Sequence, residues 1–148
     1  MDRKTFIKTC GIACVGGAAM TTFLQSCGIS KTLTGTINNN DLFVALSDFE
    51  TKAGNEIHYK KYVIVNNETL KFPICVYRHD AKNYTALWMQ CTHQGAELQV
   101  YGDKLQCPAH GSEFNNKGEV TNSPASQSLR AFPVTIINNQ LQISLKAA

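Results

Sequence analysis

The stretch Cys91–Phe114, CTHQGAELQVYGDKLQCPAHGSEF, contains two pairs of cysteine and histidine on which the interpretation of the whole chain depends. The first pair has the spacing C-x-H and the second has C-x2-H, with fifteen residues between the two cysteines. Thiolate and imidazole are good ligands for both zinc and iron. The four side chains therefore predict a metal site, which is either structural or redox-active.

The segment between the two pairs is predicted to be a β-hairpin. Leu98–Tyr101 and Lys104–Gln106 flank Gly102-Asp103, a two-residue turn that admits positive φ. The hairpin would place two loops face to face, each presenting one sulfur and one nitrogen. A zinc finger is different, because it places its two cysteines together and its two histidines together on a helix.

The rest of the chain after residue 40 is also predicted to be strand. Its short β-like runs are separated by turns rich in Asn, Asp and Gly, and no long amphipathic helix is visible. The runs are Asp41–Phe49, Glu56–Val65, Phe72–Tyr77, Tyr84–Gln90, Leu129–Ile137 and Gln140–Leu145. The predicted fold class is all-β and mostly antiparallel, as a sandwich or a small barrel-like stack.

The patterns C-x-H-x-G at 91–95 and C-P-x-H-G-S at 107–112 resemble the signature of the Rieske iron–sulfur family. The resemblance covers roughly residues 41–148 and implies an antiparallel β sandwich with a cluster-binding hairpin subdomain. It also implies one [2Fe–2S] cluster per chain. Cys91 and Cys107 would bind the inner iron, and His93 and His110 would bind the outer, reducible iron.

The same resemblance assigns roles to residues around the ligands. Gly95 and Gly111 match the glycines that let each loop turn tightly beneath the cluster. Ser112 matches a serine whose hydroxyl donates to a bridging sulfide, whereas Phe114 stands where high-potential members have a tyrosine. Pro124 falls in the family's proline loop, which covers the cluster.

The predicted reduction potential is intermediate within the Rieske range. Two neutral imidazoles replace anionic thiolates, which raises the potential from about −400 mV for all-cysteine clusters to roughly −150 to +300 mV. High-potential members tie their loops with a disulfide, but this chain has Ala96 and Ala109 at those positions. We expect a potential below that of quinol-oxidising complexes and above that of the ring-hydroxylating type.

The first 26 residues are predicted to be a signal peptide. Met1–Lys8 is basic, and Thr9–Leu24 is an apolar run that is too short and too Gly-rich for a bilayer span. The run ends at Leu24-Gln25-Ser26-Cys27, which resembles a bacterial lipobox, so Cys27 is the expected lipidation site. Residues 27–40 would link this anchor to a domain at 41–148. The alternative is an uncleaved anchor helix, and either reading places the domain on the periplasmic side, tethered to the membrane.

Composition and the remaining ligand-type residues narrow the function. The chain has 148 residues and a formal charge of +3, without a basic stripe, so nucleic-acid binding has no support. Cys75 is expected to be a buried thiol in a strand. His58 and His79 are expected on the surface, and no histidine follows His110, so the mononuclear iron site of a ring-hydroxylating oxygenase is not expected in this chain.

The sequence therefore predicts an electron-transfer protein with no independent catalytic site. It would be a membrane-tethered carrier or the Rieske subunit of a respiratory complex, with a cytochrome or a quinol-oxidising complex as its redox partner. Two alternatives are a Rieske ferredoxin that feeds an oxygenase and a structural zinc-binding module.

Overall fold

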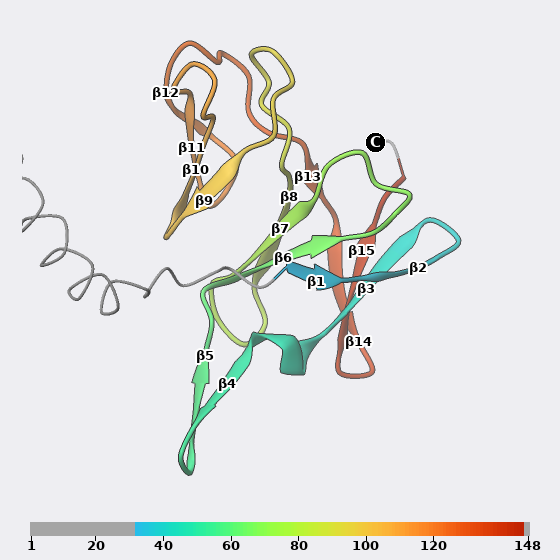
Figure 1. Cartoon of the computed structure of the whole chain (residues 1–148). Helices are drawn as coiled ribbons and strands as arrows, with labels where there is room; N and C mark the ends of the chain where they lie inside the picture. The colour runs from blue at the N-terminus through green and yellow to red at the C-terminus, as the bar shows by residue number, and fades with distance from the viewer. Residues whose placement is uncertain (1–31, 147–148) are drawn as a thin grey trace, which may run out of the picture.

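The computed structural model describes residues 32–146, which form fifteen strands and one short 3₁₀ helix, η2 (Leu46–Phe49) (Figure 1). The predicted signal peptide and Cys27 lie outside the described residues. No helix among residues 32–146 has the length and apolar character needed to cross a membrane. The all-β fold class predicted from the sequence is confirmed.

Two sheets face each other and form the base of the molecule. The five-stranded sheet has the order β1 (Thr32–Thr34), β6 (Tyr62–Asn66), β7 (Ile74–Arg78), β8 (Tyr84–Trp88), β13 (Ala131–Phe132). The four-stranded sheet has the order β14 (Val134–Ile137), β15 (Gln140–Ser144), β3 (Asp41–Ala45), β2 (Thr36–Asn38). All strand pairs in these two sheets are antiparallel except β1 with β6, which is parallel.

A second four-stranded sheet carries the Cys-His stretch. Its order is β12 (Val120–Asn122), β11 (Glu113–Asn115), β10 (Lys104–Gln106), β9 (Gln99–Tyr101). The predicted turn at Gly102-Asp103 joins β9 to β10, and Gly102 has φ of 61°. A separate ribbon of β4 (Glu50–Ala53) and β5 (Glu56–Tyr59) projects from the domain with nearly every residue exposed (Figure 1).

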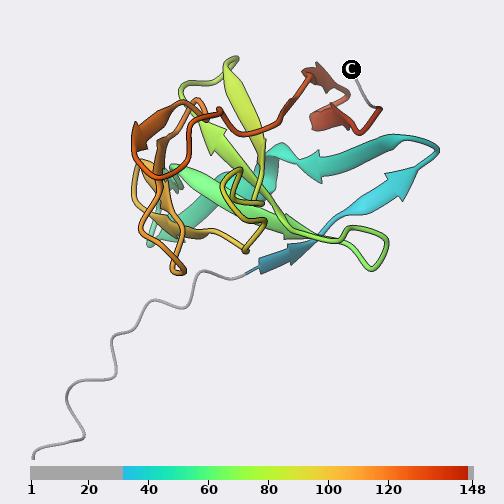
Figure 2. The same ribbon diagram turned by 90° about the horizontal axis from the view of Figure 1, so that it is seen from above.

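The five-stranded sheet is buried on both faces, because side chains in a strand alternate between its two faces. In β7, Ile74 and Val76 pack into the core shared with the four-stranded base sheet. Cys75 and Tyr77 point the other way, into a second core under the Cys-His stretch. Figure 2 shows the sheet that carries the Cys-His stretch, yellow to orange, and the cyan β2–β3 hairpin on opposite sides of the green five-stranded sheet. The Cys-His stretch thus rests on the rigid middle layer of the domain.

The predicted linker at 27–40 is wrong from residue 32 onward. Thr32–Thr34 pairs with β6, and Thr36–Asn38 pairs with β3. Between them, Gly35 is buried so tightly that an added Cβ would lie 2.4 Å from Leu42 Cδ1. The stretch is short and polar, so its pairing depends on partners distant in sequence rather than on its own periodicity.

Several predicted strands are divided where the chain passes from one sheet to another. The run 56–65 breaks at Lys60-Lys61, because β5 belongs to the exposed ribbon and β6 to the five-stranded sheet. The run 129–137 breaks at Pro133, between β13 and β14, which belong to different sheets. Proline has no backbone N–H to donate to a ladder, so a change of sheet at this residue costs little.

Candidate metal centre

The two Cys-His loops have the same backbone hydrogen bonds although their spacing differs. In the first loop, the N–H of Cys91 donates to Ala96 O at 2.8 Å and that of Gly95 to Cys91 O at 2.8 Å. In the second loop, the N–H of Cys107 donates to Ser112 O at 2.8 Å and that of Gly111 to Cys107 O at 3.0 Å. The extra residue before His110 is therefore absorbed without changing the loop closure.

A glycine is required at one turn position in each loop. Gly95 has φ of 74° and Gly111 has φ of 78°, a region that other residues rarely adopt. Gly95 also faces Gln90, whose Nε2 would lie 3.3 Å from an added Cβ. The tight turns expected at both glycines are therefore present in the structure.

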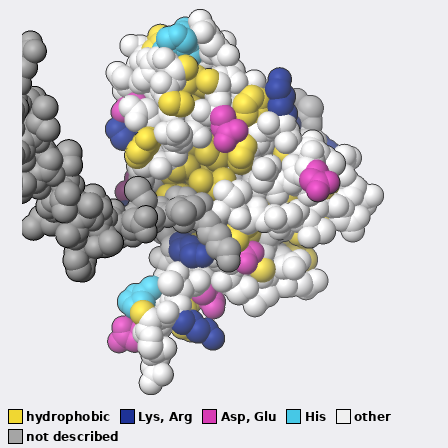
Figure 3. Space-filling view, in the orientation of Figure 1, with side chains coloured by type: hydrophobic (Ala, Val, Ile, Leu, Met, Phe, Trp, Pro, Cys, Tyr) yellow, Lys and Arg dark blue, Asp and Glu magenta, His cyan; other side chains and the backbone are white. Residues whose placement is uncertain are grey.

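The four predicted ligands are divided into a buried pair and an exposed pair. Cys91 and Cys107 are each 2% exposed and belong to the same hydrophobic core. His93 and His110 are exposed, with ring centroids 5.1 Å apart and planes at 87°. Figure 3 shows histidine surface at the end of the molecule where the loops lie. An inner pair of thiols and an outer pair of imidazoles is the donor set that a two-iron cluster with unlike irons requires.

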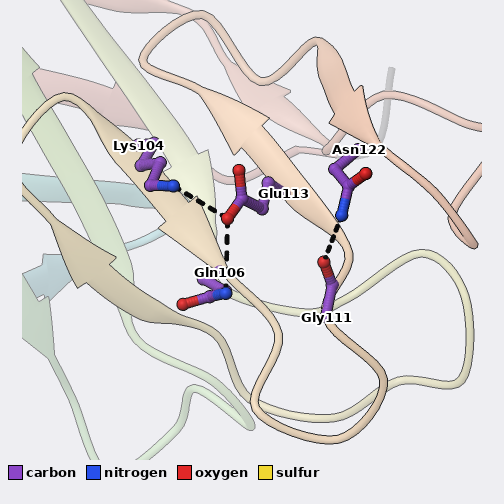
Figure 4. A network of polar contacts seen from close by, with 5 residues as sticks. All are labelled: Lys104, Gln106, Gly111, Glu113 and Asn122. Atoms are coloured by element: carbon purple, nitrogen blue, oxygen red, sulfur yellow. Dashed lines mark hydrogen bonds and ion pairs between the residues drawn. The ribbon is translucent and has the colours of Figure 1, made fainter.

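A third segment, residues 122–127, is joined to both loops by hydrogen bonds. Thr92 Oγ1 in the first loop donates to Gln127 O at 2.6 Å. Asn122 Nδ2 donates to Gly111 O in the second loop at 3.0 Å (Figure 4). Ala125 N donates to the buried Ser112 Oγ at 3.0 Å. Sequence reasoning identified Ser112 and this segment but missed Thr92, Asn122 and Gln127, because polar residues of this kind occur in any loop.

The strands beneath the second loop are held by a smaller polar network. Lys104 Nζ and Gln106 Nε2, both on β10, donate to Glu113 Oε1 on β11, at 2.8 and 3.3 Å (Figure 4). Phe114 follows Glu113 and is fully buried in the core under the loops. A tyrosine at position 114 would therefore place its hydroxyl in this buried core, where the hydroxyl would need a hydrogen-bond acceptor.

Pro124 lies at the exposed turn of the same third segment, and the Ser123–Pro124 peptide bond is cis. Its neighbour Ala125 is buried in the core that contains both ligand cysteines. The segment is thus anchored by Ala125, while Pro124 and the residues on either side of it face solvent beside the two loops.

A hollow of ≈ 400 Å³ opens beside His93. Its walls include the imidazole of His93, Gln127 and Arg130. Trp88 and Gln90 also line it, and the Trp88 indole N–H donates to Gln90 Oε1 at 2.9 Å. The guanidinium of Arg130 lies 4.6 Å from the ring centroid of Phe132. The imidazole of His93 is therefore accessible from this side.

The other candidate residues lie outside the loops. His58 is exposed on β5 near Glu56, and His79 Nε2 lies 2.8 Å from Thr85 Oγ1 in a surface turn. Cys75 is fully buried, and burial raises the pKa of its thiol, an effect that the nearby Tyr77 hydroxyl partly offsets. All three occur where the sequence placed them. Within residues 32–146, the three cysteines are free and no three Cys, His, Asp or Glu side chains converge as they would around one ion.

Comparison with protein families decides the identity of the domain. The family described as the Rieske [2Fe-2S] domain matches residues 50–133, which is more than half of the chain. The chain belongs to the Rieske [2Fe–2S] family. A Rieske domain binds a [2Fe–2S] cluster and transfers electrons, so the paired loops need no set of three ligands on one metal.

The curated relatives of this Rieske domain include iron-sulfur subunits of cytochrome b6-f complexes. The chain is 36% identical over 56 residues to the cytochrome b6-f complex iron-sulfur subunit 1 of Synechocystis, a match that covers 36% of this chain and 32% of that protein. A subunit from Prochlorococcus marinus matches equally, also over 32% of its length. The matched segment thus spans about a third of these relatives.

Solved Rieske structures that resemble this chain include a plasma membrane protein and a chain from an oxygenase–ferredoxin complex. The plasma membrane Rieske protein of Synechocystis has 26% identity and a TM-score of 0.50, covering 57% of this chain and 86% of that one. A chain from the complex of oxygenase and ferredoxin in carbazole 1,9a-dioxygenase has 28% identity and a TM-score of 0.54, covering 75% of this chain and 98% of that one.

Proposed function

We propose that Cys91 and Cys107 hold one iron of the cluster and that His93 and His110 hold the other. The observation that carries this assignment is the burial of the two thiols beneath two exposed imidazoles, on loops with matching hydrogen bonds. When bound, the cluster accepts and passes on one electron at a time. The chain's own residues keep the sulfurs dry and present the imidazole edges to a redox partner.

We further propose that the protein is a membrane-tethered electron carrier, or the Rieske subunit of a respiratory complex, on the periplasmic side. The expected lipidation at Cys27 supplies the tether, with residues 1–26 as signal peptide. The cytochrome b6-f relatives support a partner of the quinol or cytochrome type.

The surface around the histidines favours an uncharged docking site. Residues 92–96, 108–111 and 122–128 contain no Asp, Glu, Lys or Arg. Charged complementary surfaces steer association and make its rate depend strongly on salt. Arg130 contributes a single charge to the wall of the hollow beside His93, so the tip suits a neutral quinol or an apolar site in a membrane complex better than a strongly charged soluble carrier.

The assignment is tested by spectroscopy on the intact protein. We expect visible absorption and a rhombic EPR signal after reduction, both lost in Cys91→Ser and Cys107→Ser and kept in Cys75→Ser. A colourless wild-type protein with stoichiometric zinc would exclude the cluster. Fractionation of cells that express Cys27→Ala tests the tether, because wild type should remain with membranes and the variant should not.

A ferredoxin that feeds an oxygenase is the second candidate, favoured by the likeness that covers 98% of the carbazole dioxygenase chain. Reduction kinetics separate the two roles. A quinol-linked carrier should be reduced rapidly by a quinol analogue, with a rate that changes less than about twofold between low and high salt. Rapid reduction by a flavin-type ferredoxin reductase, with none by the quinol analogue, would favour the oxygenase role.

A further inference from the structure

A hollow of ≈ 350 Å³ lies at the opposite end of the cluster-bearing sheet from the histidines. In Figure 1 the β9–β10 turn points toward the end of β5. The walls of the hollow come from Lys60 and Lys61 after β5, from Arg78 at the end of β7, and from Asp103 in the β9–β10 turn. The volume is at the lower end of the range for small-molecule sites, about 300–1,000 Å³.

Positive charge predominates in this hollow. Lys60, Lys61 and Arg78 face a single carboxylate, Asp103, which pairs with Lys61 Nζ at 3.1 Å. Lys60 Nζ donates to a neutral acceptor, the backbone carbonyl of Asp48, at 2.9 Å. Among the described residues Arg78 forms no salt bridge, although hydrogen bonds and, more weakly, its charge lower the pKa of the exposed Asp80 carboxylate. The hollow therefore has cationic groups in excess, which attract an anion.

The guanidinium of Arg78 lies against an aromatic ring. It lies 4.1 Å from the ring centroid of Tyr59, and the Arg78 backbone N–H donates to Lys61 O at 2.8 Å. Stacking on an aromatic face occupies the flat side of a guanidinium and leaves the N–H edge available. That edge matches two oxygens of a phosphate or a carboxylate.

A buried hydroxyl without a hydrogen bond is the second sign of a binding site. Tyr77 lines the hollow, is 2% exposed, and its hydroxyl has no hydrogen-bond partner. The Cys75 thiol is close to it, but sulfur is only a weak acceptor, so the hydroxyl lacks a strong oxygen or nitrogen partner. Burial is the main reason that the pKa of Tyr77 is raised, and the Cys75 thiol, Tyr62 and the Asp103 carboxylate raise it further. Asp103 lines the same hollow as Tyr77.

We propose that this hollow binds a phosphate-type oxyanion, which takes the N–H edge of Arg78 and displaces Asp103 from Lys61. A tetrahedral oxyanion has enough acceptor oxygens for Arg78, Lys61 and the Tyr77 hydroxyl at once. In the free protein Asp103 acts as an internal substitute for that anion. Inorganic phosphate and the headgroup of an anionic phospholipid share this chemistry.

The first test is calorimetric titration of the full-length holoprotein with inorganic phosphate at constant ionic strength, with sodium chloride as reference. Wild type should show saturable binding. Arg78→Gln should weaken it at least about tenfold, because a bidentate charge-assisted contact is lost. Asp103→Asn should tighten it several-fold by removing the competing carboxylate. Lys71→Gln, which removes one exposed charge elsewhere, should bind like wild type.

Tyr77→Phe distinguishes a ligand-binding role from a structural one. Removing an unsatisfied buried hydroxyl should leave the melting temperature unchanged or raise it, whereas phosphate binding should weaken several-fold. If Tyr77→Phe instead lowers the melting temperature and leaves phosphate binding unchanged, the hydroxyl is structural and the proposal is wrong. Absence of saturable binding in both wild type and Asp103→Asn would also overturn it.

Vesicle binding identifies the source of the anion. The full-length Cys27→Ala holoprotein is mixed with vesicles of phosphatidylglycerol or of phosphatidylcholine and sedimented. Retention on phosphatidylglycerol alone, lost in Arg78→Gln and displaced by phosphate, would assign the site to a lipid headgroup. Calorimetric binding of phosphate without such retention would assign it to a free phosphate. Neither outcome depends on the cluster, so the result is independent of the electron-transfer role.

Discussion

Ser112 offers the sharpest test of the proposed cluster site, because its single hydroxyl is expected to make two separable contributions. The side chain is fully buried, and its Oγ accepts the Ala125 N–H at 3.0 Å. A hydroxyl has one proton to donate as well as lone pairs to accept. The bond from Ala125 leaves that proton for an acceptor on the cluster side, as the family resemblance implies.

The Ser112→Ala substitution removes both contributions, and each has a different magnitude and readout. The Ala125 N–H loses its acceptor in a buried position, which should lower the free energy of unfolding by about 1–3 kcal/mol. The Ser112 hydroxyl should bond the reduced, more negative cluster more strongly than the oxidised one, by about 1–2 kcal/mol. Loss of this donor should therefore lower the midpoint potential by about 40–90 mV, because 1.4 kcal/mol corresponds to about 59 mV for one electron.

The assay is a redox titration followed by EPR, together with thermal unfolding of the same preparations. Ser126→Ala is the matched control, because it removes an exposed hydroxyl from the segment that Ala125 belongs to. A potential equal to that of wild type with reduced stability would mean that the hydroxyl only braces the loop. A variant equal to wild type in both measurements would refute the reasoning altogether.

Two further substitutions and one labelling experiment test separate parts of the fold and site. Phe114→Tyr should raise the midpoint potential by tens of millivolts if the added hydroxyl reaches a cysteine sulfur; a loss of about 1–3 kcal/mol in stability at constant potential would show that it remains unsatisfied. Gly35→Ala should destabilise the domain by about 1–3 kcal/mol in thermal unfolding, because its Cβ would lie 2.4 Å from Leu42, whereas no effect would restore the linker interpretation. Cys75 should resist alkylation in the native protein at pH 8 and react on unfolding, because burial raises its pKa and the thiolate is the nucleophile; labelling of the native protein, followed by mass spectrometry, would contradict its placement.

The fold class was predictable because strand periodicity and turn chemistry are local properties. Asn138 and Asn139 adopt φ of 48° and 65°, as their position in the final hairpin requires. The predicted start of the domain was wrong where a strand pairs with another strand that is distant in the sequence. Thr32–Thr34 has one apolar residue and forms a strand because it pairs with β6, about thirty residues later. No local sequence pattern encodes this pairing.

The metal site was predictable to a different degree. The family resemblance gave the loop glycines, whose positive φ the structure has, and it gave the four ligands, which stay a prediction. Thr92 and Asn122 could not be predicted, since a hydroxyl or an amide becomes a brace only when the fold places a carbonyl beside it. The hollow at the far end of the sheet was also invisible, because Lys61 and Asp103 lie far in the sequence from the adjacent residues Tyr77 and Arg78.

The hydrogen bonds of Thr92 and Asn122 hold the two loops in place. The disulfide of high-potential Rieske proteins is not possible here, because Ala96 and Ala109 occupy the positions of its cysteines. Each loop is tied to segment 122–127 rather than to the other, through Thr92 in one case and Asn122 in the other. Hydrogen bonds are unaffected by thiol reductants, whereas a disulfide is cleaved by them. The cluster should therefore persist through long exposure to excess dithiothreitol, followed by visible absorption and EPR. Loss of the cluster under reductant but not under buffer alone would show that the segment does not replace the covalent tie.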